Sequence, residues 1–197
     1  MSVKAVADPA RYSYYVTDEA YGELVEDFLD WQSEDRVVED VSERDMFRRL
    51  VEREARILDR LLLEDWLKLY APECFYWVPS TPSGGDPRRE IAVMFDDRRR
   101  LEDRVYRLRT GYAWSQAPSS RTSRMISNVE VFSSPRSDQR MVRSNFQISE
   151  FWDGEIRALA GWAGHRFRQV DGAWLISAKQ VNLLNCDQCI RNPSIVL

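Results

Sequence analysis

The chain has 197 residues, a formal net charge of −4 at pH 7 and a hydrophobic content of 44%, which fits one domain with a core of its own, with or without an arm. The acidic balance argues against binding to nucleic acid, and no apolar stretch reaches the roughly 18 residues of a membrane-spanning helix. One histidine, His165, and three cysteines are present. A Rieske cluster takes two of each, and zinc or non-haem iron sites take two or three histidines, so we expect no metal on this chain.

The first 17 residues contain proline and show little apolar pattern, and they lack the apolar run of a signal peptide. We expect them to form an arm. An odd number of cysteines suits a reducing compartment better than a disulfide framework. The sequence therefore predicts a cytoplasmic protein.

Residues 18–45 are strongly acidic, with twelve Asp or Glu against two Arg. Apolar residues recur at near-helical spacing between Tyr21 and Trp31, which predicts an amphipathic helix with an acidic outer face. That face is either a solvated surface or a docking surface for a basic partner. We divide the chain into an arm with this acidic helix, residues 1–42, and a folded domain, residues 43–197.

The clearest predicted helix comes next. Ser42 and Asp45 stand in the positions of a capping box, with Asp in place of the usual Glu or Gln. An apolar stripe with helical spacing begins at Phe47 and includes either Ala55 or Glu54. This stripe predicts a long helix that packs one face against a core.

Shorter elements follow this helix. The pattern predicts a short helix over residues 63–70, an aromatic strand over residues 74–78 and a Pro- and Gly-rich loop over residues 79–87. An arginine-rich helix is predicted over residues 94–109, ending at the capping glycine Gly111.

After residue 120 the apolar period changes from 3.6 to 2, which predicts strands joined by tight turns. Strands are expected over residues 125–131, over 142–149, from 156 through His165, and over 174–183. Helices followed by an antiparallel meander make an α+β fold. Helices gathered on one face favour a strongly curved sheet, and so the cystatin-like, or NTF2-like (nuclear-transport-factor-2-like), cone with a partly apolar interior.

Two features of the predicted sheet could carry chemistry. His165 is either a general base inside a cone cavity, helped by a carboxylate or a tyrosine, or a structural histidine on the sheet surface beside Arg166 and Arg168. The sequence places no carboxylate to pair with it. Cys186 and Cys189 have a spacing used in redox and zinc sites, but they follow a strand instead of opening a helix, which favours inert thiols.

Other features allow two interpretations each. The arginine-rich helix could bind an anion or nucleic acid, but its interleaved acidic residues favour internal ion pairs or a protein interface. Large aromatic side chains could line a ligand cavity, or they could fill the core or anchor an interface. The tryptophans concerned are Trp66, Trp77, Trp114, Trp152, Trp162 and Trp174. Phosphate-binding loop motifs and the G-x-S-x-G motif do not occur in the sequence.

One set of segments is more specific. Residues 108–129 read LRTGYAWSQAPSSRTSRMISNV, residues 52–59 EREARILD, residues 65–70 DWLKLY, residues 76–79 YWVP and residues 171–176 DGAWLI. In this order they closely resemble the small (β) subunit of bacterial Rieske-type aromatic-ring-hydroxylating dioxygenases. The resemblance covers residues 45–197. The acidic segment is longer than the usual start of the family, and the loop at residues 80–90 varies freely in it.

The resemblance implies a cone-fold subunit with no cofactor and no catalytic residue of its own. Its partner would be a large α subunit that carries a Rieske [2Fe–2S] cluster and a mononuclear Fe(II), in an α3β3 assembly. Electrons would come from NAD(P)H through a reductase and often a ferredoxin, and the α subunit would add both atoms of O₂ to an arene to give a cis-dihydrodiol. The β subunit would be mainly structural, with an influence on substrate range in some members.

The same resemblance points to residues at the subunit interface. Arg109 and Arg121 would tie a helix end and a strand start into subunit contacts through charge-assisted hydrogen bonds. Tyr76, Trp77 and Trp114 would be aromatic anchors. The alternative function is a free-standing NTF2-like dehydratase or isomerase that uses His165 in a cone cavity.

Overall fold

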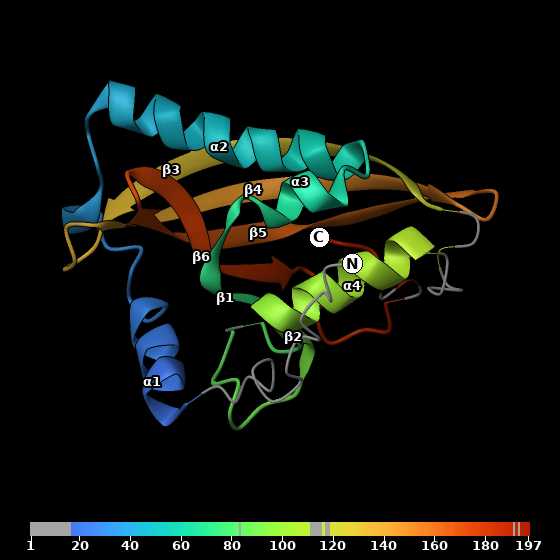
Figure 1. Ribbon diagram of the computed structural model, residues 1–197, viewed down its shortest axis with the longest axis horizontal. Coiled ribbons are helices and arrows are strands. Elements are labelled where there is room, and N and C mark those ends of the chain that lie inside the picture. The colour runs from blue at the N-terminus through green and yellow to red at the C-terminus, as the bar shows by residue number, and fades with distance from the viewer. Residues whose placement is uncertain (1–16, 83, 111–115, 117–118, 191, 193) are drawn as a thin grey trace, which may run out of the picture.

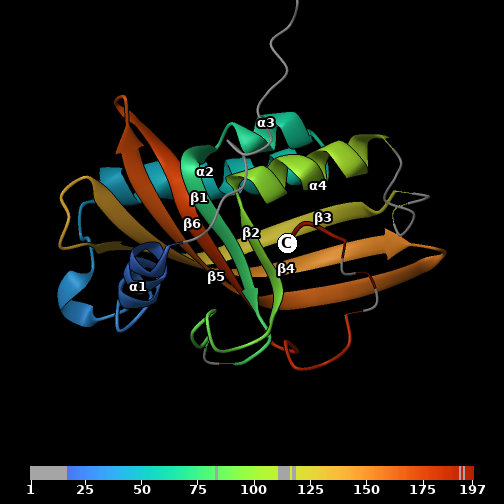
Figure 2. The same ribbon diagram turned by 60° about the horizontal axis from the view of Figure 1, so that its bottom comes forward.

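A computed structural model describes residues 17–82, 84–110, 116, 119–190, 192 and 194–197. In this part of the chain, six strands form one curled sheet in the order β2-β1-β6-β5-β4-β3 (Figures 1 and 2). Neighbouring strands run antiparallel, except that β1 and β6 are parallel. The strands are β1 (Tyr70–Pro79), β2 (Ala92–Asp97), β3 (Arg121–Ser133), β4 (Gln139–Trp152), β5 (Glu155–Val170) and β6 (Ala173–Leu183).

The helices divide between the two faces of the sheet. On the inner, concave face lie α2 (Val41–Asp59), α3 (Leu63–Leu67) and α4 (Arg98–Thr110), and α1 (Asp18–Asp27) lies on the other side (Figure 2). Residues of β5 contact elements on both faces of the sheet. On the inner face Phe167 packs against Phe47 of α2, with ring centroids 5.3 Å apart. On the outer face Gly164 lies against the segment after α1. The predicted α+β fold, with helices on a strongly curved sheet, is confirmed. No described helix is long and apolar enough to cross a membrane.

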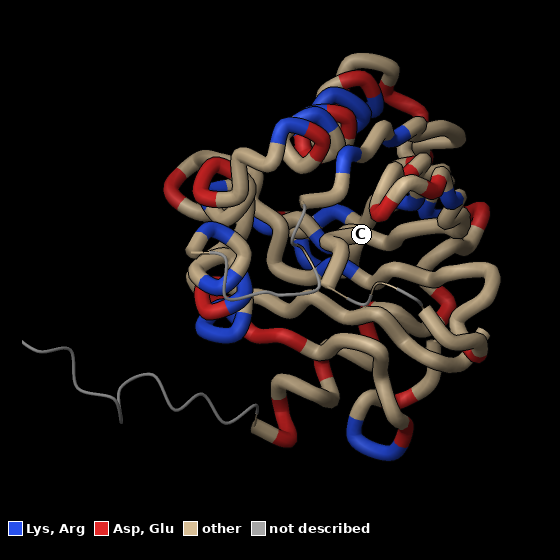
Figure 3. The backbone as a smooth tube through the Cα atoms, turned by 90° about the vertical axis from the view of Figure 1, so that its right-hand side faces the viewer, with Lys and Arg blue, Asp and Glu red and all other residues tan. Residues whose placement is uncertain are grey.

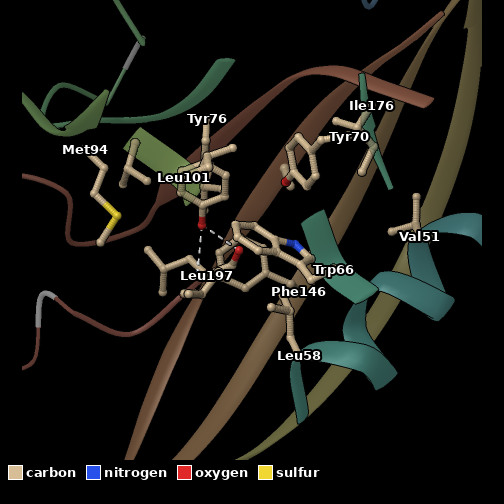
Figure 4. Close-up of a cluster of buried hydrophobic side chains, with 14 of the residues drawn as sticks. Val51, Leu58, Trp66, Tyr70, Tyr76, Met94, Leu101, Phe146, Ile176 and Leu197 are labelled. Carbon is tan, nitrogen blue, oxygen red and sulfur yellow. Dashed lines mark hydrogen bonds between the residues drawn. The ribbon is translucent and has the colours of Figure 1, made fainter. Parts of the chain in front are cut away.

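The core lies between the inner face and its helices. Figure 4 shows side chains from α2, α3 and α4 meeting those of β1, β2, β4 and β6 there. Trp66 and Tyr76 are the largest fully buried side chains, and Trp66 stands edge-on to both Tyr70 and Tyr76. Such edge-to-face pairs add roughly 0.5–1.5 kcal/mol beyond the burial of their apolar area. The closing segment, which we define as residues 194–197, enters this core with Ile195, Val196 and Leu197 all buried.

The long helix forms as predicted, but another residue caps it. Asp40 is the N-cap, and its carboxylate accepts the backbone N–H of Glu43 at 2.7 Å. The prediction that Ser42 and Asp45 form a capping box was therefore wrong. Asp45 instead pairs with Arg48 and Arg49 one turn further on, and acidic and basic positions interleave around α2 at the top of Figure 3.

The acidic segment is not one helix. α1 ends at Asp27, and Asp30 has a left-handed backbone, with φ of 48°, which a continuing helix cannot contain. The chain then turns so that Trp31, which the sequence placed on the helix, is buried against Phe132 and Trp162. The proposed boundary at residue 42 stays a prediction.

At Gly164 the segment after α1 lies directly against the sheet. A Cβ atom there would lie 2.9 Å from ring atoms of both Phe28 and Trp31. Any other residue would push these two rings away from the outer face. The absence of a side chain at Gly164 therefore allows the aromatic pair to sit directly on β5.

Two strands replace parts of the predicted helices. Residues 70–79 form β1, so the short helix ends earlier than expected, at Leu67. Met94 belongs to strand β2, where it pairs with Val78 of β1. The arginine-rich helix therefore starts only at Arg98. The carboxylate of Asp97 accepts the N–H of Arg100 at 2.8 Å and so caps the helix start. The four-strand meander is confirmed, and β1 and β2 extend it to six strands.

Candidate functional site

A buried polar cluster lies between α2 and the inner face of the sheet, and we call it the Glu54 cluster. Glu54 Oε2 lies 2.9 Å from His165 Nε2 of β5 and 3.0 Å from Lys179 Nζ of β6. Its other oxygen, Oε1, accepts hydrogen bonds from Trp66 Nε1 and Tyr70 Oη, each at 2.9 Å. One carboxylate is thus shared by four donors, and all five side chains are buried.

Burial and mutual attraction set the ionisation of this cluster. Burial alone would raise the pKa of Glu54, but the charge of Lys179 and the hydrogen bond from His165 outweigh it and hold that pKa well below its usual range. Burial lowers the pKa of His165 and of Lys179, and Glu54 opposes both shifts. Burial raises the pKa of Tyr70, and the Glu54 charge adds to the effect. Near neutral pH we therefore read Glu54 as a carboxylate and His165 as a neutral imidazole.

The imidazole has the orientation that a general base requires. With Nε2–H donating to Glu54, Nδ1 carries the free lone pair, and it has no hydrogen-bond partner among the described residues. The space beside the cluster is small, at about 20 Å³, and Leu197 closes it on one side. That volume holds about one water molecule. The arrangement could move a proton, but it leaves no room for an organic substrate in this conformation.

A larger cavity of about 210 Å³ lies on the outer side of the closing segment. Apolar side chains such as Leu58, Leu61 and Leu108 line it together with Arg109 and Ile195. The closing segment therefore forms a wall between two cavities. Only the inner one touches the Glu54 cluster.

The structure corrects the interpretation of His165. It is not on the sheet surface beside Arg166 and Arg168, because alternate residues of a strand point to opposite faces. Arg166 and Arg168 point outward to α1, whereas His165 is 1% exposed and points inward. Sequence reasoning missed Glu54 as its partner. The available signal was a carboxylate within the apolar stripe of α2.

The predicted interface residues occupy different places. Tyr76 and Trp77 are buried within the chain at 1% and 2% exposure, where they serve its own core. Arg109 and Arg121 are exposed; Arg109 lies 3.3 Å from Glu64, and the guanidinium of Arg121 stacks on Phe151. Trp114 lies outside the described residues. The assignment of these residues to an interface stays a prediction.

The cysteines are all free. Cys186 is buried and Cys189 is exposed, whereas burial raises the pKa of Cys74 to about 12. Within the described ranges, no three His, Cys, Asp or Glu side chains are grouped so that they could hold a metal ion. The only histidine is already engaged by Glu54. The described residues therefore do not fit an iron–sulfur cluster or a mononuclear iron.

The acidic helix binds the chain's own arginines. Glu23 lies 3.1 Å from Arg136 and 3.3 Å from Arg168, and Asp27 lies 2.7 Å from Arg166. The hydrogen bond from Arg136 lowers the pKa of Glu23. Part of the acidic face is thus used within the chain, to fasten α1 to the outer face of the sheet.

Beyond α1 the outer face leaves apolar side chains in solvent, and we call Met125, Phe151, Ile156 and Leu184 the outer patch. Ile156 and Leu184 are 77% and 78% exposed. Arg121, Phe151 and Ile156 lie opposite one another in register across β3, β4 and β5. Met125 and Leu184 line a surface hollow of about 430 Å³. The row of Ser123, Ser149 and Ala158 separates these two apolar groups on the same face. Exposed apolar groups that gather on one face of a protein are candidates for an interaction surface.

Comparisons with known proteins agree with this architecture. Residues 53–188 match the family model described as the ring hydroxylating beta subunit. The small oxygenase component of the p-cumate 2,3-dioxygenase system of Pseudomonas putida is 33% identical over 133 residues, which are 66% of this chain and 73% of that one. The beta subunit of benzoate 1,2-dioxygenase of Acinetobacter baylyi is 40% identical over 83 residues, which are 40% of this chain and 49% of the relative.

Solved structures show the same fold. The beta subunit of benzoate 1,2-dioxygenase from Burkholderia mallei aligns with a TM-score of 0.63 and 26% identity, over 80% of this chain and 97% of that one. A naphthalene 1,2-dioxygenase chain aligns with a TM-score of 0.70 and 18% identity, over 92% and 95%. A protein with a cystatin-like fold from Nostoc punctiforme aligns with a TM-score of 0.50 and 13% identity, over 73% and 92%. The predicted cone fold is thereby confirmed.

Proposed function

Since this chain belongs to the ring-hydroxylating beta subunit family, we propose that it is the non-catalytic, structural subunit of a terminal oxygenase. In this proposal a large α subunit carries the Rieske cluster and the mononuclear iron, and the two chains assemble as α3β3 in the cytoplasm. The α subunit cis-dihydroxylates an aromatic compound with O₂ and with electrons delivered from NAD(P)H by a reductase and a ferredoxin.

The filled interior of the cone is the observation that supports a non-catalytic role. Beside the Glu54 cluster there is space for about one water molecule, and Leu197 occupies the adjoining volume. A catalytic pocket must hold a substrate next to its acid or base. The interior instead places four donors around one buried carboxylate, an arrangement that fixes how α2 sits on β5 and β6.

In this proposal the outer patch is a place of contact with the α subunit. Its apolar residues are exposed, and Arg121 extends the same row through its stacking on Phe151. Arg109 projects from the end of α4 with an exposed side chain. Interfaces with this composition, an apolar centre with arginine nearby, are typical of stable complexes.

A free-standing dehydratase or isomerase is the second candidate, and the Glu54–His165 contact favours it. A carboxylate that orients an imidazole is a common acid–base pair. The 20 Å³ cavity argues against it, because a substrate would have to displace the closing segment first. Turnover by the isolated chain that is lost in His165→Asn would support this second function.

Co-expression with the α chain encoded beside this gene tests the proposal. We expect the two chains to co-purify as a large complex, with size measured by light scattering. Ile156→Asp should weaken that complex, whereas Ile91→Asp, which changes an equally exposed isoleucine outside the outer patch, should leave it intact. A chain that remains alone beside a folded, iron-loaded α subunit contradicts the proposal.

A further inference from the structure

The hydrogen bonds that hold residues 196 and 197 in the cone are made by their backbone, while their side chains are buried in the core. Leu197 O accepts a hydrogen bond from Tyr76 Oη at 2.7 Å, and Leu197 N–H donates to Tyr76 Oη at 2.9 Å (Figure 4). Leu197 O also accepts a hydrogen bond from Lys179 Nζ at 2.9 Å. One residue earlier, Val196 O accepts from the Arg124 guanidinium. These contacts recognise oxygen acceptors and an amide N–H rather than particular side chains.

The donors themselves belong to the rigid sheet. Tyr76 is on β1, Arg124 on β3 and Lys179 on β6, and all three are largely buried. The two cations are oriented from behind by carboxylates, Glu54 for Lys179 and Asp59 for Arg124. The donors therefore keep their positions when the closing segment is moved, and they then require another acceptor because a buried donor without one is unfavourable.

The volume around the segment is already partly hollow. Leu197 borders the 20 Å³ cavity, and Ile195 and Val196 border the 210 Å³ cavity. Displacing residues 195–197 would add the volume of three residues to these two cavities, which already share Leu58 and Arg124 in their lining. The result falls in the size class of small-molecule sites, roughly 300–1,000 Å³. Its deep end is lined by Phe146, Ile148 and Val181 as well as by the polar cluster.

We propose that the cone interior is a binding site for a small apolar molecule carrying a carbonyl or carboxylate oxygen, and that residues 195–197 of the chain itself occupy this site. The ligand places its oxygen where Leu197 O lies, against Tyr76 and Lys179. Its apolar body replaces the Leu197 side chain among Phe146, Ile148 and Val181. This inference goes beyond the structural role in the complex and does not depend on it.

Calorimetry on the full chain tests the proposal with two probes that carry the isobutyl body of leucine, 4-methylpentanamide and 4-methylpentanoate. Leu197→Ala removes the apolar anchor of the segment, and we expect it to bind at least one probe at least tenfold more tightly than the natural chain. The probe that binds tells whether a neutral or a charged head is preferred. Adding Tyr76→Phe to Leu197→Ala should reduce that affinity several-fold, because it removes only the hydroxyl donor.

Leu24→Ala is the matched control, since Leu24 is an equally buried leucine in a separate apolar cluster on the outer face. It should bind neither probe better than the natural chain. Equal binding by Leu24→Ala, no binding by a folded Leu197→Ala, or no effect of the hydroxyl would each overturn the proposal. If Leu197→Ala does not fold, hydrogen exchange of the Leu197 amide in the natural chain decides: faster exchange with added probe supports displacement, and unchanged exchange contradicts it.

Discussion

The two faces of the sheet use charge in opposite ways. On the inner face, Glu54 is buried and shared by four donors, and it joins α2 to β5 and β6. On the outer face, Glu23 is partly exposed and pairs with arginines on the turn before β4 and at the far end of β5. Exposed pairs contribute roughly 0–1 kcal/mol each, whereas breaking a buried pair by removing one partner is far more destabilising. Removing Glu54 should therefore lower the stability of the fold more than removing Glu23, whose exposed pairs fasten a helix to the sheet.

Glu54→Ala should show the largest effect. It leaves the buried Lys179 ammonium without its counter-ion and three further donors without an acceptor, so we expect a loss of about 3–5 kcal/mol in the free energy of unfolding. Urea unfolding measures it. Glu52→Gln is the control, because Glu52 pairs with Arg48 on the exposed side of the same helix and should change stability by less than ~1 kcal/mol. Similar losses in the two variants would contradict the contrast between the faces.

Gly164→Ala should have the next largest effect, on the outer face. The added Cβ meets ring atoms of Phe28 and Trp31 at 2.9 Å, and overpacking of this kind lowers stability by roughly 1–3 kcal/mol. Gly22→Ala in α1 is the matched change, because a Cβ there meets nothing within 4 Å. It should stabilise the chain by up to about 1 kcal/mol, since alanine favours helix. Thermal unfolding compares the stabilities of the two variants. A Gly164→Ala variant that is as stable as the natural chain would refute the close packing at this position.

Acid should weaken the inner face through His165. Burial holds the pKa of His165 below its ordinary 6.5, so below pH 6.5 the unfolded chain binds a proton that the folded chain does not. This stability is fully present above pH 6.5 and falls as the pH drops toward the folded pKa, by at most about 1.4 kcal/mol per pH unit. The lowered pKa of Glu54 adds a further loss as the pH falls below 4.5.

Urea unfolding at pH 7.5 and 5.5 measures this change in the natural chain and in His165→Gln. The variant should lose the part of the pH dependence that lies between 6.5 and 5.5. An unchanged pH dependence in the variant would show that another group is responsible.

Ile156→Asp should have the smallest effect on the isolated chain, within about 0.5 kcal/mol, because Ile156 is 77% exposed. Chemical unfolding of the chain alone measures it. Together with loss of the α complex in co-purification, this result would assign the outer patch to assembly rather than to folding. A large loss of stability would instead place Ile156 in the fold of the chain itself.

The apolar periodicity of the sequence predicted those helices and strands whose pattern depends only on residues close together in the chain. The stripe of α2 and the alternation of β3 to β6 arise from local repeats, and each was predicted correctly in kind. The β2 strand was missed because the arginine-rich α4 follows it with no turn residue between them, so that Met94 fits a helical stripe as well as a strand. Only its pairing with Val78 decides between the two.

The Glu54 cluster could not be predicted because its members are distant in the sequence. Glu54 and His165 are 111 residues apart. Their contact depends on the register with which β5 joins the sheet. The break at Asp30 was missed for a different reason. A left-handed residue ends the helix without any glycine or proline in the sequence to mark the position.

The parallel pairing of β1 with β6 has a consequence for how the chain acquires its structure during synthesis. Tyr70 pairs with Ile176, and between them come β2, α4 and the rest of the meander. Because β1 is synthesised long before β6, one edge of β1 and the apolar side of α2 lack their partner strand until β6 has been made. Contacts with such large sequence separation slow folding and leave intermediates with exposed apolar surface. The interior of the cone is therefore completed only after β6 has been synthesised.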